Sequence, residues 1–108
     1  MSDCLQRVYD TILDRRDHPV EKSYTHYLFE QGLDKMLKKV GEECAETIIA
    51  MKNGVTEDTV GEIADLTYHL LVAMAQSGIT PAQVEALLDE RHGHAGNLKT
   101  FHQTDKNT

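Results

Sequence analysis

Residues 38–69 read KKVGEECAETIIAMKNGVTEDTVGEIADLTYH, and this stretch decides the fold. It contains two short acidic runs, 42–46 and 62–65, on either side of an Asn-Gly pair. The carboxylates of these runs are Glu42, Glu43, Glu46, Glu62 and Asp65. Both runs have the periodicity of a helix, in which residues three or four apart share a face. Each predicted helix therefore offers a cluster of oxygen ligands.

The link Asn53-Gly54-Val55 ends the first of these helices, because Asn-Gly is a strong C-cap signal. A link this short makes the helices predicted at about 33–51 and 56–77 antiparallel neighbours. Glu46 lies about two turns before the link, and Glu62 and Asp65 lie about two turns after it. The acidic runs then lie level, about 10 Å from the end of the hairpin. With helix axes about 8–10 Å apart, their carboxylates can close on one ion.

Two interpretations of the acidic runs compete. A solvated helix face is the simpler one for 42–46, where Lys38 and Lys39 lie four residues before Glu42 and Glu43. Asp65, however, adjoins a strongly apolar sequence, and a carboxylate there is costly to desolvate without a positive partner. A divalent cation is the simplest partner for converging carboxylates, and Mg²⁺ prefers oxygen ligands. The shared height of the runs favours this metal site.

The remaining periodicity predicts an all-α bundle of four to five helices around the antiparallel hairpin. Further helices are expected at about 3–16, 24–29 and 81–91. The expected cap residues are Ser23, Thr56 and Thr80, with Thr80 and Gln83 in a capping box. Residues 1–93 form the predicted domain, and 94–108 form a polar C-terminal tail.

The helix predicted at 33–51 has one apolar stripe, which we expect to face the core. Its members are Leu33, Met36, Leu37, Val40, Cys44, Thr47, Ile48 and Met51. The helix at 56–77 is apolar nearly all round from Ile63 onward, which is typical of a central bundle helix or an oligomer interface. His69 is expected to be a packed, hydrogen-bonded core histidine.

Composition excludes several classes of protein. The chain has 108 residues, enough for one core, and a net charge of −7, which argues against nucleic-acid binding. No apolar run approaches the 18 or so residues of a membrane span, and the first residues lack the apolar core of a signal peptide. Cys4 and Cys44 match no metal spacing, so we expect reduced thiols in a cytoplasmic protein. The chain contains neither Glu-x-x-His pairs for di-iron chemistry nor a G-x-x-x-x-G-K loop.

Glu-Glu-x-x-Glu followed by Glu-x-x-Asp resembles the all-α NTP pyrophosphohydrolases, the MazG-like superfamily. Within it, the chain resembles the phosphoribosyl-ATP pyrophosphatases of histidine biosynthesis over roughly residues 5–92. The strings that resemble this family are SYT (23–25), YLF (27–29), KVGEECAET (39–47), AMKN (50–53) and EIADLTYHLLV (62–72). Cys44 and Met51 depart from it, because small residues are expected there.

This resemblance implies a MazG-like fold, an intertwined homodimer and Mg²⁺, for which Mn²⁺ can substitute. It implies hydrolysis of 1-(5-phosphoribosyl)-ATP to 1-(5-phosphoribosyl)-AMP and pyrophosphate, the second step of histidine biosynthesis. The implied metal ligands are Glu43, Glu46, Glu62 and Asp65. The implied catalytic groups are Glu42, which binds a second ion or orients the attacking water, and Lys39. The implied substrate contacts are Lys38, Lys39, Lys52, Asn53, Ser23, Tyr24 and Thr25.

Two other functions are compatible with the same residues. One is a housecleaning pyrophosphatase that acts on free nucleoside triphosphates. The other is a non-catalytic helical dimerisation module whose acidic patch is incidental. The number of metal ions and the identity of the general base stay open at this stage.

Overall fold

The computed structural model describes residues 3–93 and contains five helices and no strand within that range. The helices are α1 (Cys4–Asp17), α2 (Tyr24–Gln31), α3 (Leu33–Asn53), α4 (Thr56–Ser77) and α5 (Pro81–His92). This confirms the all-α prediction. The predicted polar tail, 94–108, lies outside the described residues. No helix between residues 3 and 93 is long and apolar enough to cross a bilayer.

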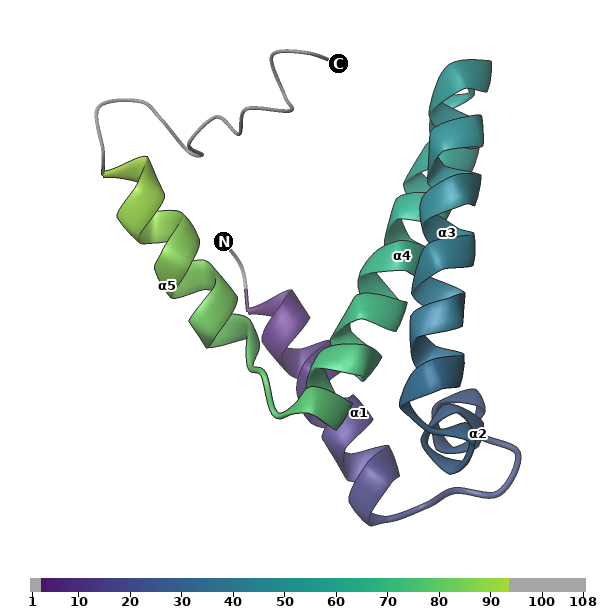
Figure 1. Ribbon diagram of the computed structural model, residues 1–108, viewed down its shortest axis with the longest axis vertical. Helices are drawn as coiled ribbons and strands as arrows, with labels where there is room; N and C mark the ends of the chain where they lie inside the picture. Colours follow the sequence, from purple (N-terminus) through teal and green to yellow (C-terminus); the bar gives the residue numbers. More distant parts are fainter. Residues whose placement is uncertain (1–2, 94–108) are drawn as a thin grey trace.

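Helices α3 and α4 run antiparallel, side by side, and form one arm of a V (Figure 1). Helix α5 forms the other arm, and α1 and α2 pack against the hairpin near the closed end. Gly54 ends α3 in the left-handed conformation at φ 78°, and its N–H donates to the carbonyl of Ala50 at 3.1 Å. The predicted hairpin is therefore confirmed, and α3 continues to Asn53.

Side-chain caps begin two of the helices as predicted. The hydroxyl of Ser23 accepts a hydrogen bond from the His26 N–H at 3.2 Å and caps α2. At α5, Thr80 and Gln83 form the reciprocal capping box, in which each side chain accepts from the other residue's N–H. These bonds satisfy amide donors that have no partner within the helix.

The predicted Thr56 cap is wrong. Val55 occupies the N-cap position in an extended conformation, and no side chain caps α4. The Thr59 N–H donates to the Val55 carbonyl at 3.1 Å, which makes Thr56 the first helical residue. The reason is the short link, because only one extended residue separates Gly54 from the helix.

The core lies at the closed end of the V. Its fully buried side chains come from four helices: Ile12, Leu28, Met36 and Val72. Residues of the second half of α4 complete it, chiefly Leu71 and Ala75. Consequently, the arm that ends at Gly54 projects beyond the core and is held mainly by contacts between α3 and α4.

The predicted core stripe of α3 is only partly correct. Met36 and Thr47 are buried, whereas Leu37 is 50% exposed and Ile48 63% exposed in this single chain. Leu33, Cys44 and Met51 are exposed as well, and Val40 is half-buried. The row that faces α4 is Met36, Glu43, Thr47 and Ala50, so the neighbouring apolar row lacks a cover within the described chain.

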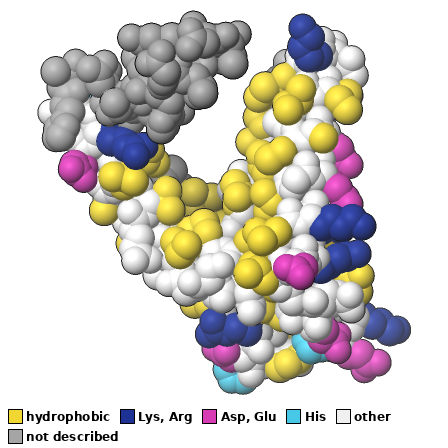
Figure 2. All heavy atoms as spheres, in the orientation of Figure 1, with side chains coloured by type: hydrophobic (Ala, Val, Ile, Leu, Met, Phe, Trp, Pro, Cys, Tyr) yellow, Lys and Arg dark blue, Asp and Glu magenta, His cyan; other side chains and the backbone are white. Residues whose placement is uncertain are grey.

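Helix α4 is buried in its second half only. Its first half exposes Val60 and Ile63, and Leu70 is also exposed. Figure 2 shows hydrophobic side chains gathered along the inner edge of the V, over the hairpin and over α5. The two predicted roles concern the segment from Ile63 onward, and its buried residues fit a bundle centre: His69, Leu71, Val72, Ala73 and Ala75.

Removing a buried side chain should test the core assignment. Leu28 is fully buried among helices α1 to α4, so Leu28→Ala should lower the free energy of unfolding by about 3 kcal/mol. Urea titration followed by circular dichroism measures this loss. The matched control is Val20→Ala in the exposed α1–α2 link. Equal losses in the two variants would contradict the placement of the core.

Candidate metal centre

The acidic side chains of α3 and α4 meet halfway along the hairpin. One carboxylate oxygen each from Glu43, Glu62 and Asp65 lies within 4.8 Å of the other two. Oxygens bound to one Mg²⁺ at about 2.1 Å lie no more than about 4.2 Å apart, so small side-chain rotations bring these three around an ion. The level acidic runs predicted from the short link are therefore present in the structure.

Two of these residues each have one carboxylate oxygen that is buried without a partner among the described residues. Glu43 Oε2 and Glu62 Oε2 are inaccessible to water and accept no hydrogen bond from the described residues. A buried carboxylate oxygen in this state is costly unless a cation or proton compensates it. The hard oxygen donors and the two unpartnered atoms fit a Mg²⁺-type ion, which would be held by Glu43, Glu62 and Asp65.

Crowding also changes the acidity of the cluster. A hydrogen-bonding contact with Glu46, burial, and the negative charges of Glu46 and Glu43 raise the pKa of Glu62 to about 7. Burial, followed by repulsion from Glu46 and Asp65, raises the pKa of Glu43. Near neutral pH the cluster thus retains a proton that a divalent cation can displace.

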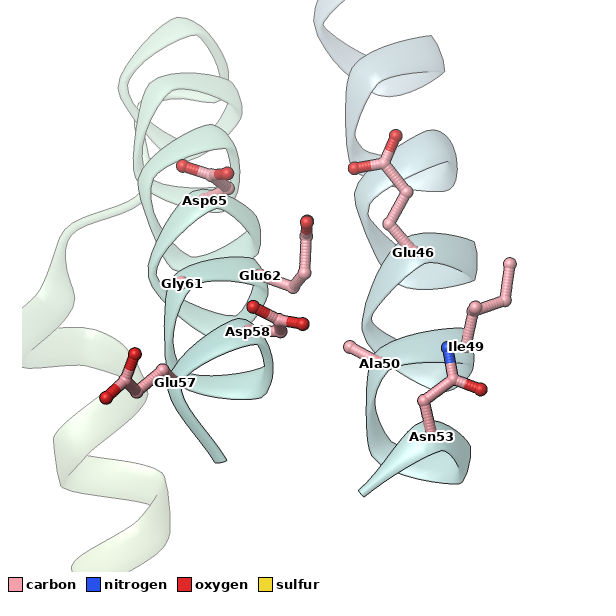
Figure 3. Close-up of a pocket in the computed structure, with 9 residues that line it drawn as sticks. All are labelled: Glu46, Ile49, Ala50, Asn53, Glu57, Asp58, Gly61, Glu62 and Asp65. Atoms are coloured by element: carbon pink, nitrogen blue, oxygen red, sulfur yellow. The ribbon is translucent and has the colours of Figure 1, made fainter. Parts of the chain in front are cut away.

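Glu46 borders the cluster from α3. It lines a cavity of about 480 Å³ that extends from Glu62 and Asp65 toward the hairpin's end (Figure 3). Glu46 and Glu62 point toward one another across the helices, whereas Glu57 points away. Gly61 also lines the cavity, and no atom stands within 4 Å of the position that its Cβ would occupy.

The predicted catalytic residues lie at the edge of this site. Glu42 and Lys39 pair with each other at 3.4 Å on the α3 surface. Glu42 is not part of the three-oxygen group and does not line the cavity. Lys38 is exposed, as is Lys52 near the end of α3, whereas Asn53 lines the cavity.

The residues predicted to contact substrate from α2 have bonds within the fold. Ser23 caps the helix, and Thr25 is buried against the hydroxyl of Tyr68. The hydroxyl of Tyr24 lies 2.9 Å from Nε2 of His69. His69 is 6% exposed, which confirms the prediction of a packed, hydrogen-bonded histidine.

Two acidic residues that line the cavity were not among the predicted site residues, Glu57 and Asp58. Asp58 lines it together with Glu62 and Asp65. Its position four and seven residues before these carboxylates was a usable signal, because residues at this spacing share a helix face.

An all-α hairpin whose two helices bring together carboxylates that could hold a metal ion is typical of the MazG-like phosphohydrolases. The family model described as phosphoribosyl-ATP pyrophosphohydrolase matches residues 5–92, and this chain belongs to that family. This confirms the resemblance drawn from the two acidic motifs.

Curated relatives agree with the family. A phosphoribosyl-ATP pyrophosphatase of Pelotomaculum thermopropionicum is 55% identical over 82% of this chain and 91% of its own length. One of Listeria welshimeri is 47% identical over 94% of this chain and 98% of its own. A histidine biosynthesis bifunctional protein HisIE of Lactococcus lactis is 52% identical over 94% of this chain, which spans 48% of that longer protein.

The raised pKa of Glu62 predicts how stability depends on pH. Its stabilising contribution is fully present below the ordinary value of 4.5 and is lost as pH rises through about 7, because the ionised group then repels its neighbours. Without metal, the melting temperature should therefore fall between about pH 5 and about pH 8. Glu62→Gln should flatten this slope.

Thermal unfolding in EDTA, with and without excess Mg²⁺, measures this effect. Mg²⁺ should oppose the loss at high pH, since the ionised carboxylate is the ligand. Glu57→Gln is the matched control, because Glu57 lies on the same helix and points away from the cluster. The same slope in wild type and Glu62→Gln would contradict the assignment.

Proposed function

We propose that this protein hydrolyses 1-(5-phosphoribosyl)-ATP to 1-(5-phosphoribosyl)-AMP and pyrophosphate, in the second step of histidine biosynthesis. The family of the chain and the names of its relatives support this reaction. The structural observation that supports it best is the three-carboxylate group with two buried, unpartnered oxygens. Positioning and neutralisation of charge dominate such a reaction, and no covalent nucleophile is needed.

We propose Mg²⁺ as the cofactor, held by Glu43, Glu62 and Asp65, with Glu46 on the border of this group as the fourth ligand. When bound, it supplies neutralisation of phosphate charge and increased acidity of a coordinated water. Mn²⁺ binds the same kind of oxygen ligands and is proposed to substitute for Mg²⁺.

The neighbouring residues suit the remaining roles. Lys39, paired with Glu42 at 3.4 Å, lies one turn before Glu43 and is placed to meet phosphate charge, with Lys38 beside it. Glu42 is proposed to orient the attacking water or to bind a second ion. The substrate contacts proposed from the cavity end and from α2 are Lys52, Asn53, Ser23, Tyr24 and Thr25.

We also propose that the protein is a homodimer. The row of Leu37 and Ile48 on α3 is uncovered, and so is the inner edge of the V. A cavity of about 280 Å³ with mostly apolar walls lies between α1, α4 and α5, and Leu70 and Val84 line it. Monomeric proteins rarely expose this much contiguous apolar surface, and a second copy would cover it.

A cytoplasmic location is proposed on the basis of Cys44, which is exposed and forms no disulfide. Exposed thiols suit a reducing compartment.

Substrate preference tests the proposed reaction. With Mg²⁺, the purified protein should release pyrophosphate from phosphoribosyl-ATP far faster than from ATP or dCTP. Equal or reversed rates would instead identify a housecleaning nucleotide pyrophosphatase. If the protein hydrolyses none of the three substrates, it is a non-catalytic module.

Removing a ligand carboxylate should abolish most of the activity. Asp65→Asn and Glu62→Gln should each lower kcat/KM by more than about 100-fold. Loss of a residue that only hydrogen-bonds a metal ligand already lowers metal affinity or activity by about 10- to 100-fold, and loss of the ligand itself should cost more. The control is Glu90→Gln, an exposed position on α5. Variants that kept full activity would refute the proposed centre.

Oligomeric state tests the proposed dimer. Leu70→Glu places a charge in the apolar cavity and should convert the dimer to a monomer in sedimentation equilibrium. Val20→Glu, in the exposed α1–α2 link, should leave the dimer intact. A wild-type protein that sediments as a monomer at micromolar concentration would overturn the proposal.

A further inference from the structure

A buried hydroxyl lies between the two helices that supply the carboxylates. Thr47 is 8% exposed and sits between α3 and α4. Its hydroxyl donates to the main-chain carbonyl of Glu43 at 2.7 Å and also reaches the carbonyl of Glu62 at 3.3 Å. A hydroxyl has one proton, so the shorter contact is the main hydrogen bond and the longer one shares it.

The bond to Glu62 distinguishes Thr47 from other helical threonines. Thr59 and Thr67 donate only to the carbonyl four residues earlier in their own helix. Thr47 makes that same local bond and, in addition, connects α3 to α4 at the level of the ligands. It therefore links the backbone of Glu43 to the backbone of Glu62, whose carboxylates meet above it.

The third carboxylate residue is held in a similar way. Nδ1 of His69 lies 2.7 Å from the main-chain carbonyl of Asp65, and a carbonyl can only accept. Nδ1 therefore bears the hydrogen, and in the neutral ring Nε2 accepts from the hydroxyl of Tyr24 at 2.9 Å. Through this chain of bonds, α2 is connected to the turn of α4 that contains Asp65.

The described residues include three buried polar side chains, Thr25, Thr47 and His69, and each of them is hydrogen-bonded. Two of the three donate to the carbonyl of a ligand residue. The third, Thr25, bonds Tyr68, which precedes His69 and stacks edge-on against its ring. Buried polar groups in a core of this size are costly, and they fix a unique geometry when fully bonded.

We propose that Thr47 and His69 are positioning residues that set the spacing of Glu43, Glu62 and Asp65, and thereby the affinity of the centre for its divalent cation. The inference rests on the metal site proposed above. Neither residue touches the ion or the substrate. Each restrains the backbone of a residue whose carboxylate is a proposed ligand. Each therefore lowers the free energy needed to bring the carboxylates together around the ion.

Mn²⁺ titration of the full chain, followed by electron paramagnetic resonance of the free ion, tests this proposal. Thr47→Val replaces the hydroxyl with a methyl group of similar volume and should raise the Mn²⁺ dissociation constant about 10-fold. Thr47→Ser keeps the donor and should stay near wild type. Thr67→Val removes an equivalent local bond on α4 and should leave Mn²⁺ affinity unchanged.

A second arm uses the histidine. Tyr24→Phe removes the donor to Nε2 and should also weaken Mn²⁺ binding, with a smaller effect than Thr47→Val because it acts one bond further away. In activity assays, Thr47→Val should need more Mg²⁺ for half-maximal rate and recover the wild-type kcat when Mg²⁺ is saturating. If Thr47 instead touched the reacting atoms, Thr47→Val would lower kcat at every Mg²⁺ concentration.

The outcomes separate the two proposals. If wild type binds Mn²⁺ and Thr47→Val binds it equally well, the positioning role is refuted and the proposed enzyme stands. If wild type binds no Mn²⁺, the metal site itself fails and this inference fails with it. Should Thr47→Val not fold, as judged by circular dichroism in EDTA, Thr47→Ala and Tyr24→Phe answer the same question.

Discussion

Three carboxylates from two antiparallel helices are held closer together than their charges favour, and the rest of the molecule follows from this constraint. A hydrogen-bonding contact with Glu46, burial, and the charges of Glu46 and Glu43 raise the pKa of Glu62 to about 7, and two buried oxygens have no partner among the described residues. A helix pair alone would relax by separating or by turning its side chains outward. The two-residue link and the packed base of the V prevent that relaxation.

The fold achieves this with few residues. The turn at Gly54 fixes the height of one acidic run relative to the other, and α1 and α2 fix the opposite end of the hairpin. Between these two restraints, Thr47 and His69 form buried hydrogen bonds at positions that apolar side chains would occupy in a fully apolar core. Repulsion at the site is therefore opposed by packing and hydrogen bonds elsewhere, as is common for preorganised centres.

Sequence reasoning predicted the hairpin and the level acidic runs because both depend on constant helical rise and on a short link. It did not predict which apolar row of α3 packs on α4, since Leu37 and Ile48 are as apolar as Met36. Periodicity identifies an apolar face and says nothing of which neighbour covers it. The bond from Thr47 across the helices was also beyond reach, because it depends on a rotamer and an interaxial distance.

The separation of core and site along the hairpin has a consequence for motion. Buried side chains concentrate at the closed end of the V, whereas the half nearer Gly54 depends on one helix–helix contact. Amide hydrogens near the turn should exchange with solvent through local opening, while those at the base exchange only on global unfolding. A cation bound by both helices midway would extend the protection of amide hydrogens outward from the base of the V. The ion would then stabilise the hairpin in addition to its role in hydrolysis.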